Sequence, residues 1–257
     1  MRMMRLLNVR GAAERFEARI ADRRIHVLRG NSTQHLAHAG ISLHRLQQRD
    51  SLCTNVSILI MHQRVEHAIA HMLISFGFDD GRHVAFSVEV RRQKNQIYSE
   101  IGGFFKRDGL SIIAADERDV IRVRTNIRGE DDYLYRIRMP LSAMRSLFLG
   151  YIEQADNLVD TPRFYNTITV NCTTLVYHMM KRIVGYLPWS YRLLFTGYLP
   201  TYVYQVGGLD QRFSLPELRT LGRITDRAKQ SDRSETFSAD IRKGIPAIDP
   251  ASLPPAP

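Results

Sequence analysis

Two β-prone runs joined by a tight turn are the feature that most constrains this sequence. Residues 71–78 (HMLISFGF) are apolar almost throughout, and residues 83–91 (HVAFSVEVR) alternate between apolar and polar side chains. Asp79, Asp80 and Gly81 lie between the two runs, and residues of these types favour a reversal of the chain. The pattern predicts a β-hairpin whose second strand has one apolar face. Such a hairpin is not stable alone, so the chain must build a larger sheet around it.

The residues that follow supply strands and helices for this sheet. Pro140 marks a boundary and Ser142 can cap a helix, after which apolar residues recur at three-and-four spacing. Three further strands and two helices are expected, the strands over residues 110–115, 120–125 and 133–139 and the helices over residues 142–157 and 171–184. We therefore predict an α+β fold in which an antiparallel sheet of about five strands packs against two helices.

The ends of the chain are less regular than its centre. Residues 1–66 are predicted to be a poorly defined basic segment, residues 67–230 the folded domain, and residues 231–257 a disordered tail, because the tail is polar and then rich in proline and alanine. The sequence has no stretch of about 18 apolar residues and therefore predicts no membrane-spanning helix. The first residues carry no readable export signal.

Composition limits the partners of this chain. The net charge of +10 and the pI of about 9.9 favour an anionic partner, either nucleic acid or an anionic membrane surface. No helix-turn-helix spacing, zinc module or RNA-binding aromatic signature accompanies the arginines, so we expect a membrane surface and no nucleic acid. The scattered histidines do not form a metal motif. Cys53 and Cys172 are the only cysteines, too few for a disulfide framework or a zinc site of paired thiolates.

Cys172 lies where a cysteine can become a nucleophile. It follows Asn171, a good N-cap, and opens an amphipathic helix with Thr173 next to it. The unpaired N–H groups and the positive end of the helix dipole stabilise a thiolate, and the same groups can donate to an oxyanion. Asn171 and Thr173 are therefore candidate oxyanion or substrate residues. The alternative is that Cys172 is an inert, buried side chain.

A thiolate nucleophile needs a base and a group that orients the base. If the hairpin turns at Asp80 and Gly81, His71 and Glu89 pair across it within a couple of residues. Their side chains would then share a face, with Glu89 holding the imidazole of His71. The alternatives are a strand-end histidine with a structural partner and a solvated carboxylate. This chemistry requires no metal and no organic cofactor.

Four segments resemble the DUF4105 family, the periplasmic domain of the Lnb lipoprotein N-acylation proteins. They occur in the family's order, at residues 71–78, 87–92, 115–125 and 165–174. The resemblance implies a circularly permuted papain-like thiol fold of the NlpC/P60 type, in which His71, Glu89 and Cys172 are the catalytic residues. It also implies acyl transfer from a lipid ester through a thioester to a lipoprotein, in the periplasm or on the outer face of the inner membrane.

Further residues are weaker candidates for the site. Tyr165 and Asn166 precede the Cys172 helix and could shape its oxyanion side, and Arg91 could contact a lipid phosphate or pair with a carboxylate. The charged run at residues 116–119 could bind a headgroup, although such a run is more often a solvated turn. A cluster of aromatic residues after the Cys172 helix could lie at a membrane interface, but such residues more often pack against the core. Its members are Trp189, Tyr191, Phe195 and Tyr198.

The interpretation is a Cys-His thiol acyltransferase that acts on lipid or lipoprotein substrates through an acyl-enzyme. One alternative is a thiol hydrolase of the NlpC/P60 type that acts on cell-wall peptides, and another is a non-catalytic envelope-binding module. An apolar tunnel beside Cys172 would favour lipid, whereas an open polar groove would favour a peptide. A binding module would leave Cys172 inert and His71 out of its reach.

Overall fold

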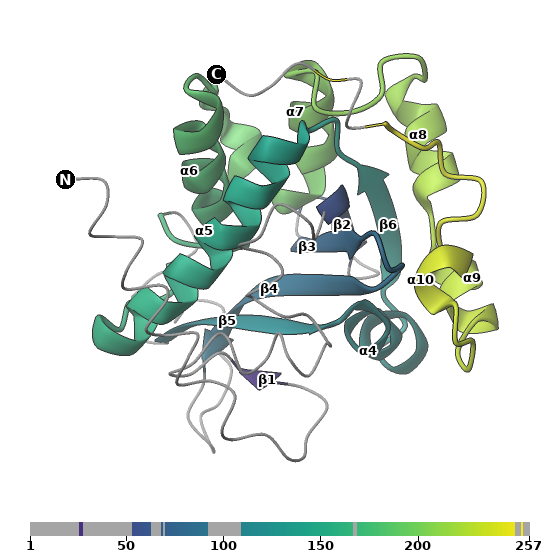
Figure 1. Ribbon diagram of the computed structural model, residues 1–257, viewed down its shortest axis with the longest axis horizontal. Coiled ribbons are helices and arrows are strands. Elements are labelled where there is room, and N and C mark those ends of the chain that lie inside the picture. Colours follow the sequence, from purple (N-terminus) through teal and green to yellow (C-terminus); the bar gives the residue numbers. More distant parts are fainter. Residues whose placement is uncertain are drawn as a thin grey trace.

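An antiparallel sheet lies between two layers of helices (Figure 1). The computed structural model describes residues 26–27, 53–62, 68, 70–91, 109–166, 169–249 and 253. The strands in spatial order are β1 (His26–Val27), β5 (Gly109–Asp116), β4 (His83–Arg91), β3 (Ala70–Phe78), β2 (Cys53–His62) and β6 (Asp131–Arg136). The α+β class and the antiparallel sheet are thus confirmed, with five strands longer than the two-residue β1.

The central hairpin has the predicted turn. Strands β3 and β4 pair from Leu73 opposite Ser87 to Gly77 opposite His83. The N–H of Gly81 donates to the carbonyl of Phe78 at 3.1 Å, and Gly81 has a φ of 81°, a conformation that glycine adopts without strain. The turn therefore fixes the register, and with it which side chains of β3 and β4 point to each face.

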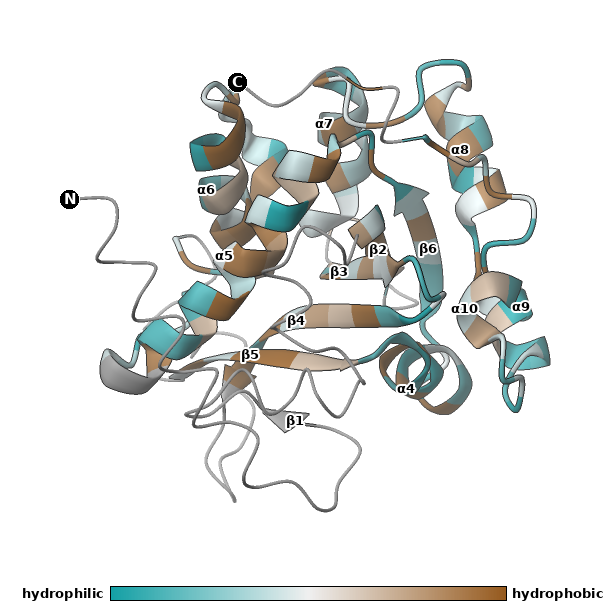
Figure 2. Cartoon of the chain, in the orientation of Figure 1, coloured by the Kyte–Doolittle hydropathy of each residue, from teal (hydrophilic) through white to brown (hydrophobic). Residues whose placement is uncertain are grey.

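One face of the sheet packs against three helices, α5 (Leu141–Asp160), α6 (Cys172–Val184) and α7 (Leu199–Gln205). The predicted helices at residues 142–157 and 171–184 are α5 and α6. Four aromatic rings fill the centre of this layer: Phe76, Phe86, Phe148 and Tyr151. Figure 2 shows the apolar residues of α5 and α6 turned toward the sheet and hydrophilic residues on their outer sides. This is the amphipathic pattern that the sequence predicted.

Residues 120–125 are helical, so the predicted strand there is wrong. Helix α4 (Glu117–Arg122) continues as the π-helical turn η2 (Val123–Ile127). Asp116 caps α4, since its side chain accepts a hydrogen bond from the N–H of Arg118 at 2.8 Å. The β-branched residues suggested a strand, but the N-cap and the acidic first turn determine the local structure. Ile121 is fully buried against the second face of the sheet.

Strand β2 shows that the predicted domain boundary at residue 67 is wrong. This strand lies inside the sheet, between β3 and β6, and pairs with both. Its residues Val56, Ile58 and Ile60 belong to the core under the helices, whereas Leu59 and Met61 face the opposite layer. The folded domain therefore begins at least as early as Cys53.

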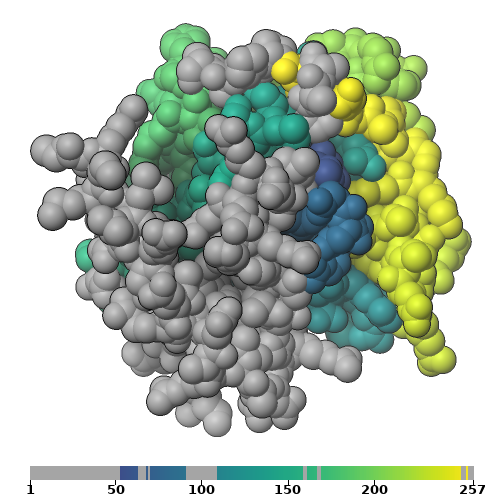
Figure 3. All heavy atoms as spheres, in the orientation of Figure 1, coloured from purple at the N-terminus to yellow at the C-terminus, as the bar shows by residue number. Residues whose placement is uncertain are grey.

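The C-terminal segment is folded to residue 249, so the predicted disordered tail is wrong for residues 231–249. After α8 (Leu215–Gly222) and α9 (Thr225–Gln230), helix α10 (Phe237–Asp240) packs on the second face of the sheet. Phe237 and Ile241 are buried, and the segment covers the surface next to the central strands, as the yellow atoms in Figure 3 show. Polar composition suggested disorder, but a few apolar residues at helical spacing anchor the segment.

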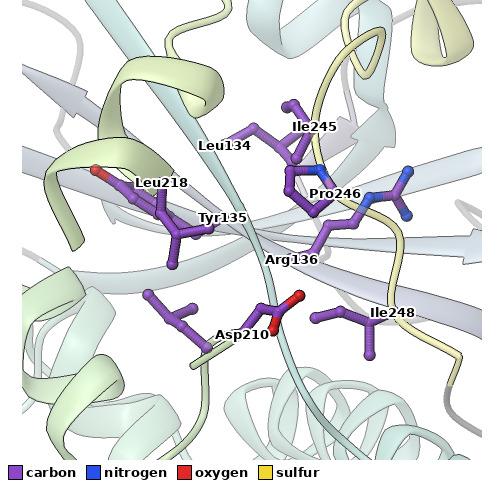
Figure 4. A pocket seen from close by; sticks show the side chains of 9 residues that line it. Leu134, Tyr135, Arg136, Asp210, Leu218, Ile245, Pro246 and Ile248 are labelled. Carbon is purple, nitrogen blue, oxygen red and sulfur yellow. The ribbon is translucent and has the colours of Figure 1, made fainter. Parts of the chain in front are cut away.

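The same segment covers the edge strand β6. Figure 4 shows Ile245 and Pro246 on one side of this strand and Leu218 on the other. They line a cavity of about 10 Å³, roughly the space of a single water molecule. On the outer edge of β6, the backbone of Tyr133 forms an isolated antiparallel β-bridge with that of Arg223. Covering an edge in this way prevents pairing with other chains.

A buried ion pair joins the C-terminal segment to the sheet. Arg242 donates to both carboxylate oxygens of Glu117, at 2.6 and 2.7 Å, and Ser75 of β3 donates to the same carboxylate at 2.6 Å. The Glu117 side chain is 0% and that of Arg242 5% exposed. Burial would raise the pKa of Glu117, but the charge of Arg242 and its hydrogen bonds lower it to about 2.

Replacing Arg242 should therefore destabilise the fold. We expect Arg242→Met to lower the free energy of unfolding by roughly 3–5 kcal/mol at pH 7, because it leaves the Glu117 carboxylate buried without its partner. Since the pKa of Glu117 is lowered in the folded state, the ion pair stabilises above about pH 4.5 and this contribution is lost as pH falls toward 2. Urea unfolding at several pH values measures both effects.

Lys243→Met is the matched control, because Lys243 is exposed and its pair with Asp240 lies at the surface. It should change stability by less than about 1 kcal/mol. Equal losses from the two variants would contradict the role given to the buried pair.

Candidate active site

Cys172 is the first residue of α6, and Asn171 is its N-cap. The Asn171 side chain accepts hydrogen bonds from the N–H groups of Thr173 and Thr174, both at 2.8 Å. The hydroxyl of Thr174 in turn accepts from the N–H of Asn171 at 2.8 Å, which completes a capping box. The predicted cap is confirmed, and it uses the Thr173 amide. That amide is therefore engaged with Asn171 and is not available as an oxyanion donor.

The sulfur of Cys172 lies in a buried polar setting. Cys172 is 4% exposed, and its sulfur lies 3.9 Å from the hydroxyl oxygens of both Thr173 and Thr196. These two hydroxyls hydrogen-bond to each other at 2.9 Å. Hydrogen bonding by the backbone N–H of Met72 also lowers the pKa of the thiol. Thr196 belongs to the short helix η4 (Thr196–Tyr198), so residues from three separate parts of the chain surround the Cys172 sulfur.

His71 and Glu89 meet across the hairpin on one face. The Nε2 atom of His71 lies 3.0 Å from a carboxylate oxygen of Glu89 and 2.8 Å from the Ser87 hydroxyl, which donates to Glu89 at 2.6 Å. Pairing between β3 and β4 begins only at Leu73 opposite Ser87. Beyond that point the strands are not bonded to each other, and the start of α6 approaches β3 there, so that Met72 and His71 reach the thiol.

His71 and Cys172 lie close enough to shift each other's pKa through charge and hydrogen bonding. Because the Nε2 atom is directed at Glu89, we infer that Nδ1 is the ring nitrogen that faces the sulfur. The structure thus brings together the three residues that the sequence singled out, in the order sulfur, imidazole and carboxylate. This is the geometry of a nucleophile, its base and the group that orients the base.

The three side chains shift one another's proton affinities. Burial would raise the pKa of Cys172, but the hydrogen bond and charge of His71 and the Met72 N–H lower it. Burial would lower the pKa of His71, but the Glu89 carboxylate and hydrogen bonds to Cys172 and Glu89 raise it to about 9. Burial would also raise the pKa of Glu89, yet His71 and Arg124 lower it to about 2. Cys172 and His71 therefore each favour the charged form of the other, which is the direction of shift expected of a thiolate–imidazolium pair.

Three residues of this site escaped the sequence analysis. Arg124 of η2 donates to Glu89 at 3.0 Å and to Glu130 at 3.2 Å, and so holds the carboxylate in place. It was missed because its segment was predicted to be a strand. Ser87 could have been found, since it lies two residues before Glu89 on the same face of β4. Thr196 had no local signal, because the chain brings it to Cys172 from 24 residues away.

The weaker candidates have mainly structural positions. The Asn166 side chain accepts from the N–H of Thr169 at 2.8 Å, and its backbone pairs with Val170, so it shapes the loop before α6. Tyr165 packs against the core. The backbone of Arg91 pairs with Gly109, but its side chain lies outside the described residues. In the charged run, Asp116 caps α4 and Glu117 is buried with Arg242, which argues against headgroup binding.

A largely apolar pocket of about 530 Å³ lies beside the start of α6. Its wall includes Met72 and Thr173, which directly follow His71 and Cys172 in the chain. Most of the remaining wall consists of aliphatic and aromatic side chains from β2, β3, α6 and α7. Examples are Ile58, Ile74, Val176, Leu193 and Val203. A volume and lining of this kind suit an apolar small molecule or chain.

Comparison with known protein families agrees with the site. The family model described as the Lnb N-terminal periplasmic domain matches residues 44–197. The chain belongs to this family. The matched range contains β2, the whole hairpin and the start of α6, and therefore His71, Glu89 and Cys172. No curated protein and no solved structure matched the chain.

Membership indicates a periplasmic, envelope-related protein. In the part of the chain that the structure describes, no helix combines the length and the apolar character needed to cross a membrane. The described residues also include no group of three or more potential metal ligands.

The coupled site predicts how Cys172 reacts with iodoacetamide. We expect alkylation with an apparent thiol pKa well below the usual value of about 8.5, moving up toward that value in His71→Ala. Burial raises the pKa of Cys53 to about 12, so Cys53 should stay unlabelled and serves as an internal control. Mass spectrometry of peptides from a pH series distinguishes the two cysteines. Slow labelling of Cys172 at the same rate in the parent and in His71→Ala would rule out the coupling of Cys172 to His71.

Proposed function

We propose that this domain is a cysteine acyltransferase that takes a fatty acyl group from a lipid ester onto Cys172 and passes it to an amine. One observation carries the proposal: the coupled sulfur, imidazole and carboxylate adjoin a 530 Å³ apolar pocket, whose wall includes Met72 and Thr173, the chain neighbours of His71 and Cys172. The site supplies the nucleophile and its base, and the pocket supplies a place for an acyl chain. Each buried methylene would contribute roughly 0.8 kcal/mol to binding.

The first half of the reaction forms a thioester. The Cys172 thiolate attacks the ester carbonyl, and the developing oxyanion accepts a hydrogen bond from the N–H of Cys172, because the amides of Thr173 and Thr174 are engaged by Asn171. The His71 imidazolium then gives its proton to the leaving alcohol oxygen as the carbon–oxygen bond breaks. Glu89, held by Arg124 and Ser87, stabilises the imidazolium and fixes the ring.

The second half regenerates the enzyme. An uncharged amine attacks the thioester carbonyl, and neutral His71 removes a proton from the attacking nitrogen. The carbon–sulfur bond breaks, the thiolate leaves, and the product is an amide. The family to which the chain belongs supports a lipoprotein amino terminus as the acceptor. The chain order of His71, Glu89 and Cys172 supports the permuted papain-like arrangement.

Hydrolysis of cell-wall peptides is the main competing reaction. A peptide with charged and polar groups would require a polar groove beside the nucleophile, whereas the pocket wall is mostly apolar. A purely non-catalytic binding role does not account for the mutual pKa shifts of His71 and Cys172 or for the pairing of Glu89 with His71 and Arg124. The lipid reaction therefore accounts for more of the site.

Intact-mass spectrometry tests the first half-reaction. Incubation with phospholipid in detergent micelles should add one acyl group to Cys172, removable by neutral hydroxylamine, as a thioester is. Cys172→Ala should show no adduct, and His71→Ala should form it about 10²–10⁴ times more slowly, the usual value of a positioned base. Val176→Phe should also suppress the adduct by filling the pocket, while iodoacetamide still labels Cys172.

The fate of the adduct separates transfer from hydrolysis. A peptide that carries a free amino terminus and a lipidated cysteine should discharge the thioester and gain the acyl group. Release of free fatty acid with no amide would identify a hydrolase. If neither phospholipid nor any other lipid ester loads Cys172 in a protein whose thiol remains reactive, the acyltransferase proposal fails.

A further inference from the structure

Five aromatic side chains project from one short segment beside the pocket. Residues 186–198 connect α6 to α7 and include η3 (Tyr191–Leu193) and η4. We call the exposed rings of this segment the aromatic rim: Tyr186 (81% exposed), Trp189 (65%), Tyr191 (52%), Phe195 (46%) and Tyr198 (44%). They account for most of the large apolar residues exposed in the described chain. Exposed apolar groups gathered in this way mark an interaction surface.

The segment is held rigidly, so the exposed rings are a fixed feature of the surface. The Tyr177 hydroxyl donates to the carbonyl of Leu187 at 3.0 Å, and the Tyr202 hydroxyl donates to that of Pro188 at 2.6 Å. Leu193 is buried between the exposed rings, and the N–H of Gly197 donates to Ala68 at 3.1 Å. The sequence analysis took packing against the core as the commoner fate of these aromatics. Four of them, from Trp189 to Tyr198, are exposed instead.

The aromatic rim is continuous with the pocket and the nucleophile. Tyr186, Leu187 and Pro188 form part of the pocket wall, and Thr196 contacts the Cys172 sulfur. One segment therefore has exposed rings on its outer side and active-site contacts on its inner side. A molecule that binds the rim would therefore lie next to the pocket wall.

The charged residues of the chain segment that carries the rim are all basic. Residues 161–209 contain no aspartate and no glutamate. Lys181 and Arg182 are exposed at the end of α6, just before the rim, and Arg192 lies over the ring of Tyr191 with its guanidinium carbon 4.9 Å from the ring centre. Basic side chains near a membrane surface bind anionic headgroups, while tyrosine and tryptophan favour the headgroup level.

We propose that the aromatic rim docks on an anionic phospholipid bilayer, with the rings at headgroup depth and Lys181, Arg182 and Arg192 on the lipid phosphates. This deepens the proposed function by naming the surface through which the site reaches its lipid. Docking would place the pocket opening against the bilayer, so that an acyl chain moves from lipid to pocket without crossing water. The docking itself does not require chemistry at Cys172.

Trp189 is the only tryptophan in the chain and reports directly on this surface. Adding vesicles of phosphatidylglycerol mixed with phosphatidylcholine to the full chain should shift its emission to shorter wavelength, and brominated lipids should quench it. The double variant Tyr191→Ser with Phe195→Ser keeps the reporter and should weaken vesicle binding at least about tenfold. Lys181→Glu with Arg182→Glu should reduce the preference for phosphatidylglycerol by about fivefold for each basic residue.

Ile127→Ser is the matched control, because Ile127 is 65% exposed but belongs to η2, away from the rim in sequence. It should bind vesicles as the parent does. Unchanged Trp189 emission with vesicles, equal weakening by Ile127→Ser, or binding that the rim variants do not weaken would overturn the proposal. So would a dimer of the free chain that the Tyr191/Phe195 variant dissociates, since a second copy would then cover the rim.

The same samples separate this proposal from the chemistry. Cys172→Ala should bind vesicles with parental affinity, and the rim variants should keep the iodoacetamide reactivity of Cys172. Binding without acylation would leave the docking surface standing and remove the acyltransferase. Acylation from detergent-dispersed lipid without vesicle binding would support the acyltransferase and remove the docking surface.

Discussion

The register of the β3–β4 hairpin determines where every other part of the site must lie. Side chains alternate along each strand, so a slip of one residue would move His71 and Glu89 to opposite faces. The turn at Gly81 sets the pairing that brings them within 3.0 Å, and the end of that pairing at Leu73 and Ser87 lets α6 approach β3. Helix α6 can then offer its first residue to His71 while its apolar face packs on the aromatic core.

The charges of the site form a chain of alternating sign. The Cys172 thiolate, the His71 imidazolium, Glu89, Arg124 and Glu130 follow one another, each with a partner of opposite charge. Burying such charges is unfavourable unless each is paired and hydrogen-bonded, and perturbed pKa values gathered at one place are typical of functional sites. The Glu117–Arg242 pair, which the Ser75 hydroxyl joins, instead links the C-terminal segment to the sheet.

Asp132 is an exception within this pattern. Its side chain is fully buried, and neither carboxylate oxygen has a hydrogen-bond partner among the residues that the structure describes. Burial and the charge of Glu130 raise its pKa well above the ordinary value. Met61 pairs with both His71 and Asp132, so these two residues lie in one row across the sheet. A protonated Asp132 adds no negative charge to this row, which leaves Glu89 as the carboxylate that orients the imidazole.

Period-two alternation, the DDG turn and the Asn171 cap were enough to predict the hairpin, helices α5 and α6, and the proximity of His71 and Glu89. These features are local, and local patterns are visible in a sequence. What failed depended on distant contacts. The segment after Asp116 is helical because its cap outweighs its β-branched residues. Arg124 contacts Glu89 from that segment. Thr196 contacts Cys172 because the tertiary fold brings together two segments that lie 24 residues apart. The C-terminal segment folds because Phe237 and Ile241 are buried on the sheet and Arg242 pairs with Glu117, 125 residues away.

The exposed aromatics and the pocket together explain why the sequence places so many rings after α6. A connection between two helices inside the core would bury these rings. Here Leu193, Thr196 and Leu199 fill the buried positions, and the rings are exposed. Water is a poor solvent for such a surface, and its exposure is unfavourable unless a partner covers it. A phospholipid bilayer satisfies the rings, the basic residues and the apolar pocket at once. A cell-wall peptide would meet only some of these groups, which is the strongest structural reason for preferring the lipid reaction.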